Sequence, residues 1–130
     1  MIEKSSALIL NEKDQLLVTK KKSNTSHYIL PGGKLEEGET PEKALIRELR
    51  EELDVNVVSY SYLATCVEKS QFEDFDLKMF MYLVKVDGIP KASREILSLD
   101  WINLDTKRKD LATGITLHAL PLLRERGKDA

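Results

Sequence analysis

The stretch GKLEEGETPEKALIRELREELDV, residues 33–55, decides the fold of this chain of 130 residues. It joins a glycine-rich loop to an acidic helix. Thr40 can cap that helix with its hydroxyl, and Pro41 suits the first helical position because the N–H that proline lacks would have no partner there. With the apolar spacing that follows, these signals predict a helix over residues 41–53.

The predicted helix has an apolar stripe beside an acidic face. At about 100° per residue, its leucines and one isoleucine fall together on the side that we expect to be buried. These residues are Leu45, Ile46, Leu49 and Leu53. Glu48, Glu51 and Glu52 gather on the adjoining face, with Glu52 at the border of the apolar stripe. Acids three and four residues apart repel one another, which weakens a helix by a few tenths of a kcal/mol per pair.

Two interpretations of the acidic face are open. It is a solvated surface, as charged runs on helices usually are, or it holds a divalent cation. Three carboxylates whose Cβ atoms lie about 6 Å apart are better explained by a cation. Oxygen ligands suit Mg²⁺, with Mn²⁺ as a substitute, and the helix holds no cysteine or histidine for a softer metal.

Charge is distributed unevenly along the chain. Residues 33–54 hold eight acids and four bases, a local charge of −4, although the whole chain carries only −2. The near balance of the whole chain argues against a binding surface for a nucleic acid polymer. Cys66 is the one cysteine, so an internal disulfide and a cysteine-based zinc cluster are excluded.

Apolar runs elsewhere are short. None approaches the roughly 20 residues of a membrane span, and the first residues do not resemble a signal peptide. We therefore expect a cytoplasmic protein with no membrane contact. The length suits a single domain covering residues 1–130.

Strand-like segments surround the helix. Residues 5–10 and 15–19 predict a hairpin, residues 20–26 a loop, residues 28–30 a short strand, and residues 31–38 a glycine-rich loop. Further strands are expected at residues 55–67, 77–86 and 96–102, followed by a short helix at 105–111 and a terminal helix at 116–126 that is interrupted at Pro121. This order predicts an α+β fold in which a mixed β-sheet lies between helices, an α/β/α sandwich.

The spacing of the glycine and the acids resembles the Nudix box. Gly33 is followed after five residues by Glu39, and after seven more by the run RELREELDV at residues 47–55. One position departs from the pattern, because Asp54 stands where the box has glycine. Aspartate tolerates the left-handed conformation expected there at a penalty of about 1 kcal/mol, which falls on the helix end and not on the acids. The chain is identified by this resemblance as a MutT-like member of the Nudix hydrolase family, with the Nudix fold throughout.

The resemblance implies roles for individual residues. Glu48, Glu51 and Glu52 would hold Mg²⁺, directly or through water, with the carbonyl of Gly32 as a further ligand. Arg47 would orient the glutamates.

Glu39 and Glu95 have more than one expected role. Glu39 would either coordinate the ion or brace the loop. The resemblance implies that an acid outside the box acts as the catalytic base or as an additional ligand. Glu95, six residues before Trp101, either has this role or is a solvated loop acid; its competitors are Glu73, Asp74 and Asp76.

Candidates for substrate binding are fewer. The resemblance implies that Gly33, lacking a side chain, lets the substrate come close. Tyr28 and Phe72 either stack on a base or pack within the core and a loop.

The expected reaction is Mg²⁺-dependent hydrolysis of the diphosphate bond in a nucleoside diphosphate derivative, most simply a (d)NTP as for MutT. Two alternatives stay open. One is a Nudix-fold module that senses a nucleotide without hydrolysing it. The other is a Nudix enzyme for a dinucleoside polyphosphate, a nucleotide sugar or a non-nucleotide diphosphate. The partner is in each case a small molecule, and the protein is expected to be a monomer or a homodimer.

Overall fold

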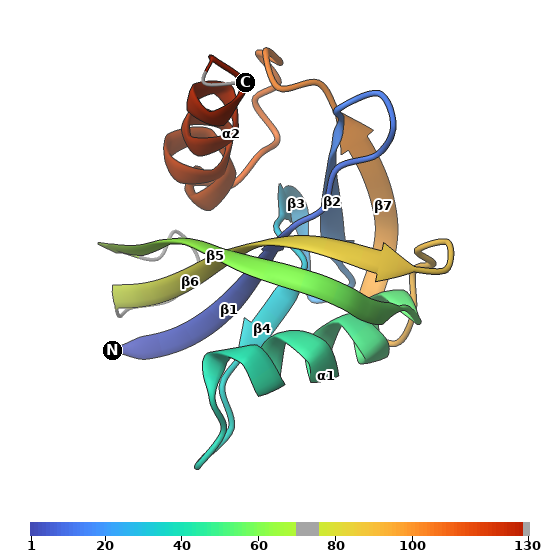
Figure 1. The fold of residues 1–130 in the computed structure, drawn as a ribbon, viewed down its shortest axis with the longest axis vertical. Helices are drawn as coiled ribbons and strands as arrows, with labels where there is room; N and C mark the ends of the chain where they lie inside the picture. Colours follow the sequence, from blue (N-terminus) through green and yellow to red (C-terminus); the bar gives the residue numbers. More distant parts are fainter. Residues whose placement is uncertain (70–75, 129–130) are drawn as a thin grey trace.

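The strands of the computed structural model divide between two sheets (Figure 1). The structure describes residues 1–69 and 76–128. In chain order the elements are β1 (Ile2–Leu8), β2 (Leu16–Lys21), β3 (Asn24–Ile29), β4 (Gly32–Lys34), α1 (Pro41–Leu53), β5 (Asn56–Lys69), β6 (Asp76–Asp87), β7 (Ile96–Ile102), the π-helical segment η1 (Gly114–Ala119) and α2 (Leu120–Lys128). The predicted α+β class is confirmed.

The larger sheet is mixed and has the order β4-β1-β6-β5. Its central pair, β1 and β6, is parallel, whereas β4 and β5 run antiparallel to their neighbours. The smaller sheet, β3-β2-β7, is antiparallel. The predicted hairpin of residues 5–10 and 15–19 is present only as a turn. Leu10 and Leu16 form an isolated antiparallel bridge, after which β1 and β2 enter different sheets.

Apolar side chains form two cores, one on each face of the mixed sheet. The three predicted leucines of α1 pack on one face together with Ala7 and Ile9 of the β1 region. Ile46, expected in the same buried stripe, lies at its edge and is 45% exposed. Leu8, whose side chain points to the opposite face of β1, packs with residues of η1 and α2. Figure 1 shows α1 and α2 on opposite sides of this sheet. Strand β1 is therefore covered on both faces, and it links the two cores.

Helix α1 has the predicted bounds and the predicted cap. The hydroxyl of Thr40 accepts a hydrogen bond from the N–H of Lys43 at 3.2 Å, and Pro41 stands in the first turn. At the other end Asp54 adopts the left-handed conformation, with φ 54° and ψ 44°. Its N–H donates to the carbonyl of Arg50 at 3.2 Å. The signals quoted from the sequence therefore set both ends of the helix.

Three predictions about local structure are wrong. Residues 24–26, expected in a loop, belong to strand β3, whose polar side chains lie at or near the surface. The glycine-rich loop contains β4, which pairs with β1. Residues 105–111 contain turns and bends and no helix.

The C-terminal helix is irregular next to Pro121, where an interruption was expected. Wide π-helical turns precede Pro121, whose ring would clash with the carbonyl four residues earlier in a regular α-helix. None of the described helices combines the length and the apolar character that crossing a bilayer requires.

Gly32 provides a test of the pairing between β1 and β4. Its φ is +132°, and an added Cβ would lie 2.0 Å from the carbonyl oxygen of Ser5. Gly32→Ala should therefore lower the free energy of unfolding by at least about 3 kcal/mol, measured by urea denaturation. Gly38→Ala is the matched control, because Gly38 also has a positive φ, +77°, but has no atom within 4 Å of an added Cβ. We expect this control to lose about 1 kcal/mol. Equal losses in the free energy of unfolding would contradict the close approach of Gly32 to the carbonyl of Ser5.

Candidate active site

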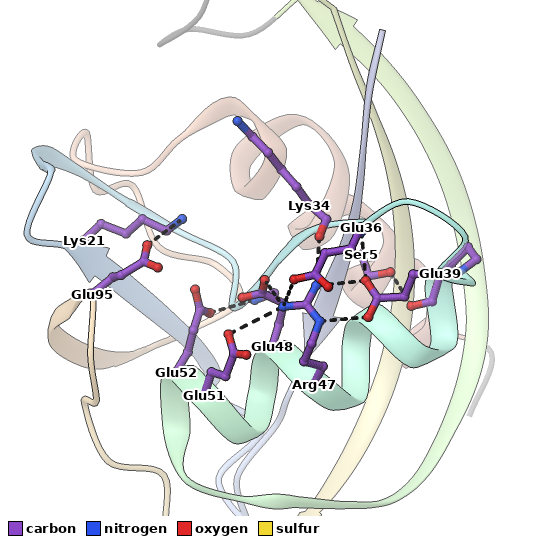
Figure 2. Close-up of polar contacts among 12 residues, drawn as sticks. Ser5, Lys21, Lys34, Glu36, Glu39, Arg47, Glu48, Glu51, Glu52 and Glu95 are labelled. Carbon is purple, nitrogen blue, oxygen red and sulfur yellow. Dashed lines mark hydrogen bonds and ion pairs between the residues drawn. The ribbon is translucent and has the colours of Figure 1, made fainter.

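The acids of α1 lie at the corner where the helix meets β4 (Figure 2). Burial of the leucine stripe fixes the rotation of the helix, so the adjoining acidic face is turned toward Gly32 and Gly33. Glu52, at the border of the stripe, is buried at 5% exposure, whereas the side chain of Glu51 is 36% exposed. Glu48, Glu51 and Glu52, which the sequence places on one helix face, therefore lie together in the structure and are buried to different extents.

Arg47 connects most of the acids through a single guanidinium. Its Nε and Nη2 donate to the two carboxylate oxygens of Glu39 at 2.8 and 2.9 Å, and its Nη1 donates to Glu48 at 2.9 Å. Nη1 also lies 3.5 Å from Glu51, and Nη2 donates to the carbonyl of Lys34 at 3.1 Å. These contacts raise the pKa of Arg47 and lower the pKa of Glu39 to about 2. Glu39 thus braces the loop through Arg47, as one of its two expected roles requires.

Glu52 is a buried carboxylate with one described hydrogen bond. Its Oε1 accepts from the N–H of Gly32 at 3.1 Å, and within residues 1–69 and 76–128 no hydrogen bond or ion pair reaches its Oε2. Burial raises the pKa of Glu52 from 4.5 to about 7. A buried carboxylate without a counter-ion is costly unless a cation neutralises it. This oxygen therefore suits a bound metal ion.

Gly33 lies directly against Glu48. A Cβ added to Gly33 would come within 2.4 Å of the carboxyl carbon of Glu48. The absence of a side chain at this position therefore leaves the room that the carboxylate occupies. Burial also raises the pKa of Glu48, against the opposing effect of Arg47.

Lys21 and Glu95 extend the site on its other side. A register shift in β2 occurs at Lys21, whose Nζ lies 4.0 Å from Glu95. The segment before β7 is held to the end of α1, because the N–H of Ser93 donates to the carbonyl of Glu52 at 3.0 Å. Glu95 is 73% exposed and acts on Glu52 electrostatically, raising its pKa, whereas Lys21 lowers it. Lys21 was not predicted as part of the site, because a run of three lysines in an expected loop gives no signal for one of them.

A cavity opens beside this corner. It encloses about 690 Å³ of space between atoms, its open mouth included. Gly32, Gly33 and Lys21 line it, and so do apolar residues of β3, β6 and η1. The same two glycines that contact Glu52 and Glu48 therefore form part of the cavity wall. A molecule bound in the cavity would have one end next to the acids.

The described residues contain no ready-formed group of three or more acidic, histidine or cysteine ligands around one point. The donors at the corner are oxygens, however, and the unpaired Oε2 of Glu52 is among them. Oxygen donors fit Mg²⁺ or Mn²⁺ and not a thiophilic metal.

Comparison with known proteins decides the family. Residues 4–122 match the NUDIX domain. The chain belongs to the Nudix hydrolase family. It is 32% identical over 108 residues to the 8-oxo-dGTP diphosphatase of Escherichia coli K12, an alignment that covers 75% of this chain and 81% of that relative.

Two further similar proteins support this family assignment. The 8-oxo-dGTP diphosphatase of Haemophilus influenzae is 35% identical over 89 residues, which cover 65% of this Nudix chain and 62%, less than two thirds, of the relative. The crystal structure of the MutT Nudix hydrolase from Burkholderia pseudomallei superposes with a TM-score of 0.77 over 95% of both chains at 24% identity. This structural likeness supports the Nudix fold.

Of the two aromatic residues expected to bind substrate in this Nudix protein, Tyr28 lies within the described residues. The ring of Tyr28 makes cation–π contacts with Lys20 and Arg108, whose cationic groups are 4.4 and 5.3 Å from its centroid. Tyr28 is not among the described residues that line the cavity. Phe72 lies outside the described residues, as do Glu73 and Asp74. Asp76 is exposed at the start of β6, opposite Lys69.

The burial of Glu52 predicts an unusual effect on stability. The pKa of this Glu is raised by folding, so the penalty for burying its charge is absent below about pH 4.5, grows as the pH rises and is complete above pH 7. In a chelator at pH 8, Glu52→Gln should therefore be more stable than the wild type by roughly 3 kcal/mol, and near pH 4 the two should agree. Thermal and urea unfolding would measure this.

Glu51→Gln is the matched control, since the side chain of Glu51 is 36% exposed. It should change the metal-free stability by less than about 0.5 kcal/mol. A loss of stability in Glu52→Gln at pH 8 would contradict the absence of a counter-ion.

Asp54, the departure from the Nudix box, yields a second prediction. Glycine adopts φ 54° more easily than aspartate, and alanine less easily. Stability should therefore follow the order Asp54→Gly, wild type, Asp54→Ala, with steps of up to about 1 kcal/mol. Substrate turnover should be the same in all three proteins, because the left-handed residue caps the helix and contacts no acid of the site. A different order in urea denaturation would show that the side chain of Asp54 has another role.

Proposed function

We propose that the protein hydrolyses a nucleoside triphosphate to a nucleoside monophosphate and pyrophosphate in the presence of Mg²⁺. The observation that carries this proposal is the buried carboxylate of Glu52, which has no described counter-ion in contact and accepts a hydrogen bond from Gly32 in the wall of the cavity. The relatives named 8-oxo-dGTP diphosphatase support a purine deoxynucleotide, and 8-oxo-dGTP is the first substrate to test.

The ligands proposed for the ion are Glu48, Glu51 and Glu52, with the carbonyl of Gly32 as the further ligand implied by the family. Their oxygens fit Mg²⁺, with Mn²⁺ as a substitute. When bound, the ion neutralises the carboxylates, binds phosphoryl oxygens and lowers the pKa of a coordinated water.

The remaining residues position the substrate and the acids. Arg47 holds Glu48 at 2.9 Å and so restricts its orientation. Lys21 presents a cation to the phosphates between the cavity and the acids, where it also reduces the repulsion of an anionic substrate. Glu95 lies across from Glu52 and is the proposed base that removes a proton from the attacking water. Its exposure leaves it accessible to a water molecule.

Two expectations from the sequence stay predictions: the cytoplasmic location and the choice between monomer and homodimer. Among the open alternatives, the hydrolase relatives favour an enzyme over a nucleotide-sensing module.

The activity test uses the full chain with 8-oxo-dGTP and the four dNTPs, with products identified by chromatography. Turnover should require Mg²⁺ and disappear in a chelator. Glu52→Gln should lower kcat by a factor of at least about 10³ because it removes the deepest anionic ligand. Glu95→Gln should lower kcat by about 10²- to 10⁴-fold, as expected for loss of a general base.

Glu12→Gln, which removes an exposed acid from a turn far from α1 in the sequence, is the control and should keep full activity. Hydrolysis that continues in the chelator would reject the proposal. Tight nucleotide binding without turnover would favour the sensing module.

A further inference from the structure

Glu68 is the one acid among the described residues that line the cavity. It lies near the end of β5, and its side chain is 16% exposed. Its Oε1 accepts a hydrogen bond from the hydroxyl of Thr113 at 2.8 Å, and its Oε2 lies 2.8 Å from Nε2 of His118. The carboxylate is thus held in one orientation by two residues of the C-terminal segment.

The position of Glu68 is far from the acids of α1. Glu68 pairs with Leu77 of β6, whereas Gly33 of β4 pairs with Ser5 of β1. Because β6 and β1 lie between β5 and β4, three strand spacings, about 14 Å, separate the two ends of the cavity. This separation is comparable to the length of an extended nucleotide. A nucleotide with its phosphates at Gly33 would therefore direct its base toward Glu68.

The surroundings of Glu68 fit a flat base. Leu30, Met79 and Ile115 contribute apolar surface to the cavity. Gly114 packs closely on Met79, since an added Cβ would lie 3.3 Å from its sulfur. Thioether sulfur makes favourable contacts with aromatic rings, and apolar walls exclude water from the polar edge of a bound base. Hydrogen bonds to Glu68 would therefore be made in a partly dry environment.

An ionised carboxylate can only accept hydrogen bonds, and each of its oxygens has two lone pairs. Thr113 and His118 use one on each oxygen, so one on each remains. Guanine offers two adjacent donors, N1–H and the 2-amino group. Adenine offers an acceptor, N1, beside its amino group, and this acceptor would face the carboxylate unfavourably.

We propose that Glu68 determines base specificity by accepting both donors of a guanine-type base. This inference rests on the proposed function and assigns the part of the substrate that the cavity distinguishes. The competing explanation is that Glu68 only fastens the C-terminal segment to β5. That role would affect stability and would change all substrates alike.

The test measures kcat/KM of the full chain for dGTP, dITP and dATP. dITP keeps the N1–H and lacks the 2-amino group, so it removes one donor. The wild type should prefer dGTP to dITP and dITP to dATP, with at least about a tenfold step for each hydrogen bond lost to the charged group. In Glu68→Gln the dGTP-to-dATP ratio should fall by at least about tenfold, mainly through KM, because glutamine offers one acceptor and one donor.

Arg124→Ala is the matched control. It removes a different anchor of the C-terminal helix, the hydrogen bond from its Nε to the carbonyl of Leu104, so its Tm should fall while the order of the three substrates is unchanged. Equal loss of kcat/KM for all three substrates in Glu68→Gln would overturn the proposal, as would a wild type without preference for dGTP. If the wild type hydrolyses none of these nucleotides, the proposed function fails separately. In that case the role of Glu68 is tested by calorimetry, which measures the affinities of the wild type and Glu68→Gln for dGMP and dAMP. The ratio of the two affinities should fall in Glu68→Gln.

Discussion

The packing of Leu45, Leu49 and Leu53 against the mixed sheet determines where every acid of the site lies. A helix can rotate about its axis only if its apolar stripe leaves the core, and here the three leucines of the stripe are fully buried. The acidic face is therefore fixed next to β4. Glu52 is drawn into the protein because it borders the stripe, and Glu51, one position earlier and turned further from the stripe, stays partly exposed. The same hydrophobic contact thus stabilises the fold and sets the depth of each carboxylate.

Electrostatics then divides the acids into two groups. Arg47 neutralises Glu39 and contacts Glu48, which stabilises the loop before the helix. Glu52 receives one backbone N–H and no described cation within contact distance. The carboxylates of Glu48 and Glu52 repel each other in the folded chain, which is consistent with a site that a bound cation completes. The neighbouring cavity adds the second requirement of a hydrolase, a place for the group that carries the phosphates.

The sequence predicted best what depends on local signals. The cap at Thr40, the proline that follows and the leucine spacing placed α1 at its observed bounds. The long β-branched strands β5, β6 and β7 were also evident. Strand β3 was missed because its polar side chains give no alternation, and β4 because two glycines in three residues resemble a loop.

Other features depend on distant parts of the chain. The division into two sheets rests on the pairing of β1 with β4 and β6, which no local pattern encodes. Lys21 joins the site through a register shift, and Glu95 through backbone bonds that hold its segment to α1. Family resemblance supplied the role proposed for Glu95, whereas no signal in one sequence could have supplied the role proposed for Lys21.

The parallel pairing of β1 with β6 has a consequence for biosynthesis. Ser5 lies beside Gly33 on one side and Phe80 on the other, so β1 is completed by a strand that is synthesised about 75 residues later. Contacts between such distant segments form slowly, and a nascent chain that lacks residues 76–87 cannot enclose β1. The glycine corner that holds Glu48 and Glu52 is paired to this same strand. The candidate site is therefore assembled only after residues 76–87 have been made, and until then β1 lacks one of its two neighbouring strands.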